Sequence, residues 1–226
     1  MKKIIALILA ALMLLTFVAC TPDTPNADKG NDSVTEPGNT DNETPEITDK
    51  DITANVSIEN IAKALINKYG EYANLRGQYD DYMASLGEDA SEEDKMTYET
   101  FASYQLVVQA VEKDAEWLMG LTEVPTGYSE CYNYIPSSMN PFMGYVFRVE
   151  EGTDIEAFKQ SLIDNCDLRW MICREANTIM CESFGDIVVF QMFVVINEYF
   201  PDGFTEEQKQ GFIDTFNTAV KTPIAE

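Results

Sequence analysis

Histidine is absent from the 226-residue sequence. Histidine is the commonest general base in enzymes, the usual partner of a Ser or Cys nucleophile, and a frequent ligand of transition metals. Its absence therefore excludes the Ser-His-Asp and Cys-His types of active site and most transition-metal sites. We expect no cofactor and no bound metal.

Basic residues are scarce as well. Lys and Arg number 15 against 39 Asp and Glu, which gives a formal net charge of −24 at pH 7. A surface of this kind repels nucleic-acid phosphates and disfavours close contact with anionic lipid head groups. We therefore expect no nucleic-acid partner, and we expect a domain that stands off the membrane.

An apolar run from Ile4 to Leu15 follows two lysines at the N-terminus. A dozen residues is short for a membrane-spanning helix, which needs roughly 20, so the run is typical of an export signal. It leads to Ala19-Cys20, which resembles the lipobox of bacterial lipoproteins, with Phe17 where leucine is common. We predict a signal peptide over 1–19 and a palmitate-type lipid anchor on Cys20. The alternative is an ordinary secretory signal with an incidental cysteine.

Large apolar side chains are almost missing from residues 20–52, which are mostly Thr, Pro, Asn, Asp, Glu and Gly. Such a segment cannot bury enough surface to offset its loss of conformational entropy on folding. We predict a disordered acidic linker with a reach of roughly 30 Å. The protein is then anchored on the outer side of the cell membrane, with a single folded domain over 53–226.

Three- and four-residue spacing of apolar side chains predicts helices in that domain. Capping residues predict where several of them begin, among them the Thr153-to-Glu156 and Thr205-to-Gln208 capping boxes. The expected helices cover 57–70, part of 72–86, 91–120, and segments that begin at Thr153 and Thr205.

Aromatic and β-branched residues predict strands at 128–135, 143–149, 178–182 and 186–195. A hairpin at 183–185 should join the last two strands, and the last strand should be covered on both faces because it is apolar throughout except for Gln191. The expected fold class is α+β: a short antiparallel sheet of about four strands, layered with helices and preceded by a helical part.

From Trp117 onward the chain resembles an uncharacterised lipoprotein domain family of Gram-positive anaerobic bacteria. The residues that carry the resemblance are Met139-Asn140, Gly144 to Val149, Gly152-x-Asp154, Asn165-x-Asp167-x-Arg169-Trp170-x-Ile172-Cys173 and Gly185-Asp186. Members share the signal, the lipid-bearing cysteine and the acidic linker. The resemblance implies the fold and the location, and it implies no activity.

Two groups of side chains are candidates for chemistry in the domain. Tyr128, Tyr132 and Tyr134 alternate along one predicted strand and could offer an aromatic ligand face, although the same pattern suits side chains packed under a helix. The cysteines Cys131, Cys166, Cys173 and Cys181 allow two disulfides in an exported chain, and small buried hydrophobic side chains explain them equally well.

Arg169 and Trp170 follow a predicted helix. We expect structural roles for both, with Arg169 pairing with Asp167 or Asp186 and Trp170 filling the edge of the core.

These features favour a non-enzymatic, membrane-tethered module that binds an envelope protein, a peptide or a glycan. The alternative is a glycosidase-like hydrolase that uses paired carboxylates, since a chain with 39 acidic residues can bring two of them together. A deep cavity with two converging carboxylates would favour the hydrolase.

Replacing the predicted anchor tests the location. Cys20→Ala should abolish incorporation of a radioactive fatty acid and leave unprocessed precursor or released protein, because no other predicted segment holds the membrane. Fractionation of cells that express either form, after labelling, measures both effects. Fatty-acid label that persists on the Cys20→Ala protein would contradict the lipobox interpretation.

Overall fold

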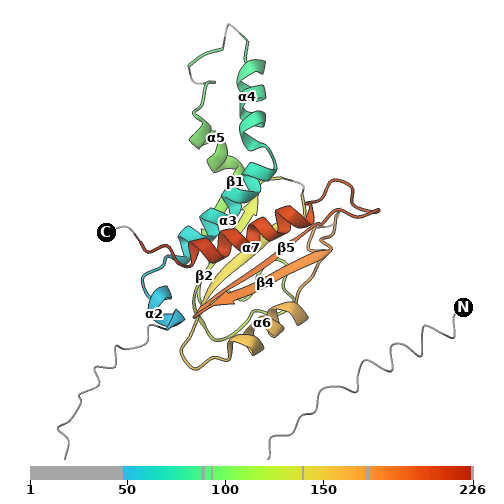
Figure 1. Cartoon of the computed structure of the whole chain (residues 1–226). Coiled ribbons are helices and arrows are strands. Elements are labelled where there is room, and N and C mark those ends of the chain that lie inside the picture. Colours follow the sequence, from blue (N-terminus) through green and yellow to red (C-terminus); the bar gives the residue numbers. More distant parts are fainter. Residues whose placement is uncertain (1–47, 88–89, 93, 139, 172–173, 225–226) are drawn as a thin grey trace, which may run out of the picture. The chain divides into compact units, whose positions relative to one another are not determined.

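The computed structural model describes residues 48–224, apart from 88–89, 93, 139 and 172–173. This part of the chain forms an α+β domain of six helices and a five-stranded antiparallel sheet (Figure 1), one strand more than expected. The helices are α2 (Asp49–Thr53), α3 (Ile58–Tyr72), α4 (Leu75–Ser85), α5 (Tyr98–Gln105), α6 (Ile155–Asp164) and α7 (Glu206–Ala219). The strands are β1 (Leu106–Ala110), β2 (Tyr128–Pro136), β3 (Met143–Val149), β4 (Thr178–Phe184) and β5 (Ile187–Phe193). None of these described helices has the length and apolar character needed to cross a membrane.

The strand order is β1-β2-β3-β5-β4, so β5 lies between β3 and β4. All seven residues of β5 are buried, which confirms the prediction of a strand covered on both faces. Its one polar side chain, Gln191, accepts a hydrogen bond of 2.8 Å from the hydroxyl of Tyr134 on β2. That bond satisfies the amide oxygen inside an otherwise apolar layer.

Two layers of helices account for this burial. Helices α3 and α7 lie side by side over one face of the sheet, where Leu65 of α3 joins the core and Phe212 of α7 packs on Phe193 of β5 with ring centroids 5.7 Å apart (Figure 1). Helix α6 covers the other face, and its Phe158 packs edge-to-face on Phe147 of β3 with ring centroids 5.3 Å apart. Burying one such phenylalanine contributes roughly 1.5–3 kcal/mol, so both faces add substantially to stability.

The predicted helix starts are confirmed at two places and shifted at a third. The Ser57 side chain accepts a hydrogen bond from the Asn60 N–H before α3, and Thr205 forms a complete capping box before α7. Helix α6 is capped by Asp154, one residue after the predicted Thr153, because the Asp154 carboxylate accepts a bond of 3.1 Å from the Ala157 N–H. The Thr153 hydroxyl instead donates to the Gly127 carbonyl.

The long helix predicted over 91–120 is wrong. The chain is helical only in α5 and becomes strand β1 at Leu106, and Val107 then pairs with Ile135 of β2. Val107 and Val108 are β-branched, and β1 gains ladder hydrogen bonds from the open edge of β2 that a helix there would forgo. The segment therefore forms the edge strand of the sheet.

Helices α4 and α5 form a hairpin that stands out from the sheet and its covering helices (Figure 1). Tyr79 of α4 contacts Tyr98 and Phe101 of α5, with both ring-centroid distances at 5.6 Å. The Arg76 guanidinium lies over the Tyr98 ring at 4.8 Å. The helical piece predicted between Tyr72 and Leu86 is thus confirmed, and aromatic contacts hold it to α5.

The folded domain begins before Thr53, because helix α2 falls within the segment expected to be linker. The Thr53 side chain is fully buried, and its hydroxyl donates to Asp186 Oδ1 at 2.5 Å. Arg148 of β3 donates to the Thr53 carbonyl at 3.3 Å, to the Val56 carbonyl at 2.6 Å and to Asp186 Oδ2 at 3.1 Å. This arginine therefore ties the start of the domain to the β4–β5 hairpin.

Removing α2 should destabilise the domain. We expect a chain that starts at residue 54 to unfold with a free energy about 1–3 kcal/mol lower than one that starts at residue 48, because Asp186 and Arg148 lose hydrogen-bond partners. The melting temperature should fall by about 2–12 °C, as measured by calorimetry. Thr53→Val in the longer chain should reproduce part of the loss. Equal melting temperatures for the two chains would show that α2 contributes nothing.

Candidate functional site

The three tyrosines proposed as a ligand face do not share a face. Tyr128 packs on Phe147 in the core under α6, whereas Tyr132 and Tyr134 lie toward the core under α3 and α7. The pairing of β2 with β3 shifts between Tyr128 and Glu130, and a bulge of this kind moves the following side chains to the opposite face. Tyr128 and Tyr134 are buried and Tyr132 is half-buried, so they form no exposed platform.

Cys131, Cys166 and Cys181 are free thiols. No disulfide therefore joins any two of these three cysteines, and the fourth candidate, Cys173, lies outside the described residues, as does Cys20. Burial raises the pKa of the Cys131 thiol, and it raises that of Cys181 from an ordinary 9.0 to about 12. Both thiols therefore stay protonated at neutral pH and behave as small buried side chains.

Arg169 pairs with neither of the two carboxylates that we expected. Its Nε lies 3.3 Å from Glu175 Oε2, while the Asp167 carboxylate accepts from the Arg169 backbone N–H, at 2.9 Å. Asp186 instead forms an ion pair with Arg148, at 3.1 Å. Trp170 packs against the core under α6, which confirms its expected role at the core edge.

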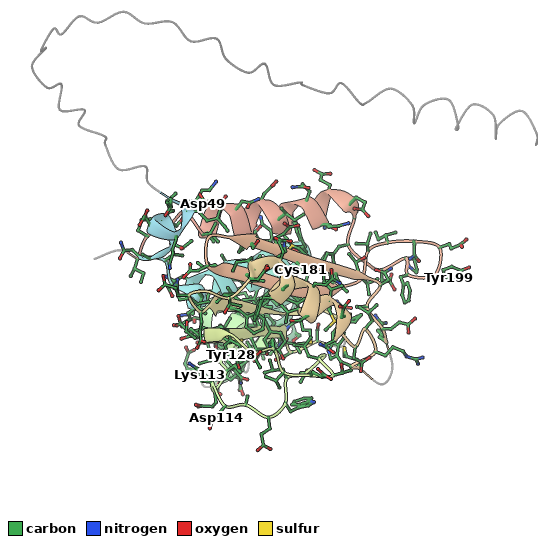
Figure 2. The ribbon with its side chains drawn as sticks, turned by 90° about the horizontal axis from the view of Figure 1, so that it is seen from below. Asp49, Lys113, Asp114, Tyr128, Cys181 and Tyr199 are labelled. Atoms are coloured by element: carbon green, nitrogen blue, oxygen red, sulfur yellow. The ribbon has the colours of Figure 1, made fainter. Side chains whose placement is uncertain are left out.

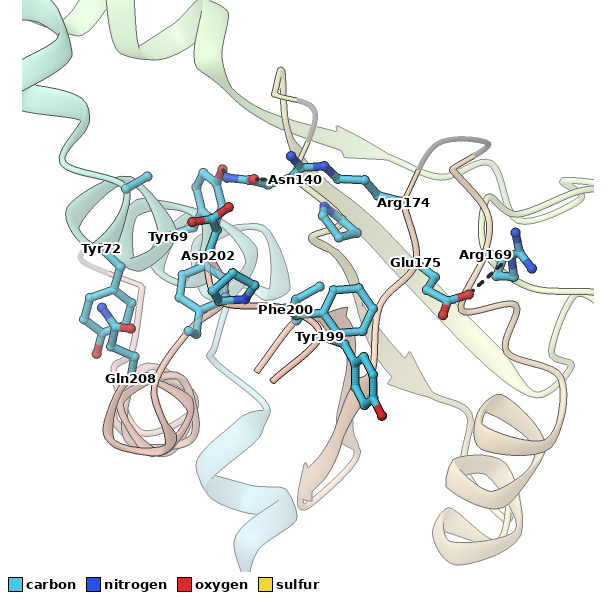
Figure 3. Close-up of a pocket in the computed structure, with 16 residues that line it drawn as sticks. Tyr69, Tyr72, Asn140, Arg169, Arg174, Glu175, Tyr199, Phe200, Asp202 and Gln208 are labelled. Carbon is cyan, nitrogen blue, oxygen red and sulfur yellow. Dashed lines mark hydrogen bonds and ion pairs between the residues drawn. The ribbon is translucent and has the colours of Figure 1, made fainter. Parts of the chain in front are cut away.

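A cavity of about 570 Å³ brings aromatic and charged side chains together (Figure 3). Four segments far apart in the sequence line it. They are the end of α3 with Tyr69 and Tyr72, the β2–β3 connection at 140–141, the segment before β4 with Arg169, Arg174 and Glu175, and the 194–208 region.

The aromatic wall of the cavity is anchored in the core. The Tyr69 ring packs on Phe142 at 4.6 Å and on Phe204 at 5.9 Å between centroids. The Tyr69 hydroxyl receives a hydrogen bond from Asn140 Nδ2 at 3.2 Å and shares another with Ser138 at 2.8 Å. These contacts hold the ring and the β2–β3 connection together as one wall.

The loop after β5 supplies the opposite wall. Its ends are joined where the Phe204 N–H donates to the Val194 carbonyl at 2.8 Å. Near its tip, Asn197 Oδ1 accepts from the backbone N–H groups of Tyr199 at 2.9 Å and Phe200 at 3.0 Å. The Tyr199 side chain is 78% exposed, so it offers an aromatic ring at the mouth of the cavity.

Glycine is required at position 203 of this loop. A Cβ there would lie 2.8 Å from the Val194 carbonyl oxygen and 2.9 Å from the Ile196 N. The tight approach closes the loop against the end of β5. The Pro201-Asp202-Gly203 sequence is a typical turn signal, and it is the feature that would have located this wall from the sequence.

Charged groups of both signs line the cavity. Glu175 is held by Arg169, and Arg174 Nη1 donates to Asn140 Oδ1 over a long distance of 3.5 Å (Figure 3). Asp202 adds a second carboxylate from the 194–208 region. Among the described residues, no three His, Cys, Asp or Glu side chains gather as a metal site would need. The cavity is thus equipped to bind a polar ligand with an apolar face.

Comparison with protein-family models, with curated proteins and with solved structures gives no match for this chain. The resemblance to an uncharacterised lipoprotein domain family therefore stays a prediction. Any function has to be inferred from the geometry and chemistry of the cavity itself.

The buried thiols predict how stability depends on pH. The pKa of the Cys181 thiol is about 12 in the folded protein and near 9.0 in the unfolded chain. The free energy of unfolding is therefore unaffected by this thiol below pH 9 and declines above it, because only the unfolded chain loses the proton there. Urea unfolding at pH 7.5, 9 and 10.5 should show a falling free energy of unfolding.

Cys181→Ala is the control for this measurement. It should flatten the decline between pH 9 and 10.5, because it removes one of the groups whose protonation differs between the folded and unfolded states. A decline that is unchanged in Cys181→Ala would contradict the assignment of this effect to the Cys181 thiol.

Proposed function

We propose that this protein is an exported, lipid-anchored binding protein that holds a small ligand in the cavity between α3, the β2–β3 connection and the 194–208 region. The observation that carries the proposal is the convergence of aromatic rings and polar groups on one concave site. A volume of about 570 Å³ lies within the range of small-molecule pockets, which is roughly 300–1,000 Å³.

Location outside the cytoplasm is supported by the sequence signal that ends at Cys20. The geometry of the domain suits an anchored receptor. Asp49, at the start of the first described helix, and Tyr199, at the mouth of the cavity, lie toward opposite ends of the domain (Figure 2). A domain anchored through its N-terminal side thus keeps its cavity remote from the point of attachment.

Binding is favoured over catalysis by the state of the carboxylates. Glu175 lies 3.3 Å from the Arg169 guanidinium, so an ion pair within the protein already engages one of its oxygens. A hydrolase of the paired-carboxylate type needs two carboxyl groups that flank the scissile bond, one of them acting as the general acid. The hydrolase is still the second candidate, because Glu175 and Asp202 line the same cavity.

Two tyrosine variants test the binding function. The lipid-free protein is applied to an array of envelope glycans and peptides. Tyr199→Ala should weaken capture of the bound components by about tenfold, since an aromatic ring at a binding site is a typical energetic hot spot. Tyr104→Ala should leave capture unchanged, because this α5 residue is comparably exposed, at 65%, and lies outside the cavity.

The same array decides between binding and hydrolysis. Equal losses in the two variants, or capture of no component by the unmodified protein, would contradict the binding function. Cleavage of a captured glycan that disappears in both Glu175→Gln and Asp202→Asn would establish the hydrolase instead.

A further inference from the structure

We infer that the ligand of this cavity is a sugar that carries a single carboxylate, and that Arg174 binds this carboxylate. The inference rests on the proposed binding function and adds the chemical class of the ligand. It follows from the charges that line the cavity and from the hydrogen-bonding groups that accompany them.

Arg174 is unusual in a chain with 39 acidic and 15 basic residues. The other three arginines, Arg76, Arg148 and Arg169, each form an ion pair with a carboxylate. Within the described residues, Arg174 has no carboxylate within ion-pair distance. An exposed arginine that lacks a carboxylate partner in so acidic a protein can take that partner from a ligand.

The surroundings of Arg174 favour such a contact. The side chain lies along the rim of the cavity and is joined to Asn140 (Figure 3). That one hydrogen bond, at 3.5 Å, leaves most of the five guanidinium N–H donors available. A planar guanidinium binds a carboxylate through two parallel hydrogen bonds, which is the strongest arrangement that it forms with an anion.

The remaining polar groups favour a ligand rich in hydroxyl groups. Glu175 and Asp202 are acceptors that repel a purely anionic ligand, but they accept hydrogen bonds from hydroxyl donors. Asn140 and Gln208 can both donate and accept. Exposed aromatic rings such as Tyr199 offer flat faces to the C–H side of a sugar ring. A sugar acid uses all three sets of groups.

A peptide carboxylate fits the same site less well. Peptide termini are typically captured by nests of free backbone amides. In the loop that forms one wall, the N–H groups of Tyr199 and Phe200 are already bonded to Asn197 Oδ1. A polyanionic chain is disfavoured by the formal charge of −24, so the ligand should carry one carboxylate and not several.

The experiment uses the lipid-free protein and three disaccharides that end in glucuronic acid, galacturonic acid or muramic acid. Each is compared by calorimetric titration with its neutral carboxamide. The affinity for at least one acid should exceed the affinity for its carboxamide by about tenfold or more, as expected for a charge-assisted bidentate contact.

Arg174→Gln should reduce the affinity for that acid by about tenfold, to about the affinity for the carboxamide. Lys221→Gln is the matched control, because this exposed lysine also has no ion pair among the described residues and lies outside the cavity. It removes the same charge from the protein and should preserve the preference for the acid.

Three outcomes would overturn the inference. Equal affinities of every acid and its carboxamide would show that the protein does not recognise the carboxylate, although it could still bind sugars. Equal effects of Arg174→Gln and Lys221→Gln would reduce the role of Arg174 to a general change in charge. Capture of peptides on the array, with no binding of the three acids, would show that the ligand is a peptide and not a sugar. The proposed binding function would still hold.

Discussion

Burial of strand β5 on both faces is the constraint on which the rest of the structure depends. All seven of its residues are inaccessible, and their side chains point alternately into two separate cores. A strand of this kind is stable only if each face of the sheet carries its own layer. Helices α3 and α7 supply one layer and α6 supplies the other. The cavity arises where the first layer ends, beside the loop that leaves β5.

Features with a local cause were predictable from the sequence. Ser57 and Thr205 begin helices because the side-chain oxygen of each accepts a hydrogen bond from the N–H group three residues along, and the spacing of apolar residues then favours continued helix. The run from Ile187 to Phe193 is apolar throughout except for Gln191, which requires a covered strand. These signals lie within a few residues of the structure that they specify.

Features that depend on distant segments were not predictable in this way. The apolar residues between Tyr98 and Leu118 fit a helix by spacing, yet Leu106 to Ala110 form a strand because the edge of β2 is available to them. The tyrosines of β2 alternate in the sequence, but the bulge near Glu130 depends on the pairing with β3. The residues that line the cavity are spread from Tyr69 to Gln208, so no single stretch of sequence predicts it.

The hydrogen-bond network at the N-terminal side of the domain and the cavity are built from different residues. On the N-terminal side, Arg148 connects Thr53 and Val56 to Asp186, so hydrogen bonds hold the first described residues to the sheet. The cavity is organised by Tyr69, Asn140 and the 194–208 region, and none of these residues takes part in that network. In the lipid-anchored receptor that we propose, the attachment point can therefore be strained while the position of Arg174 at the cavity is preserved.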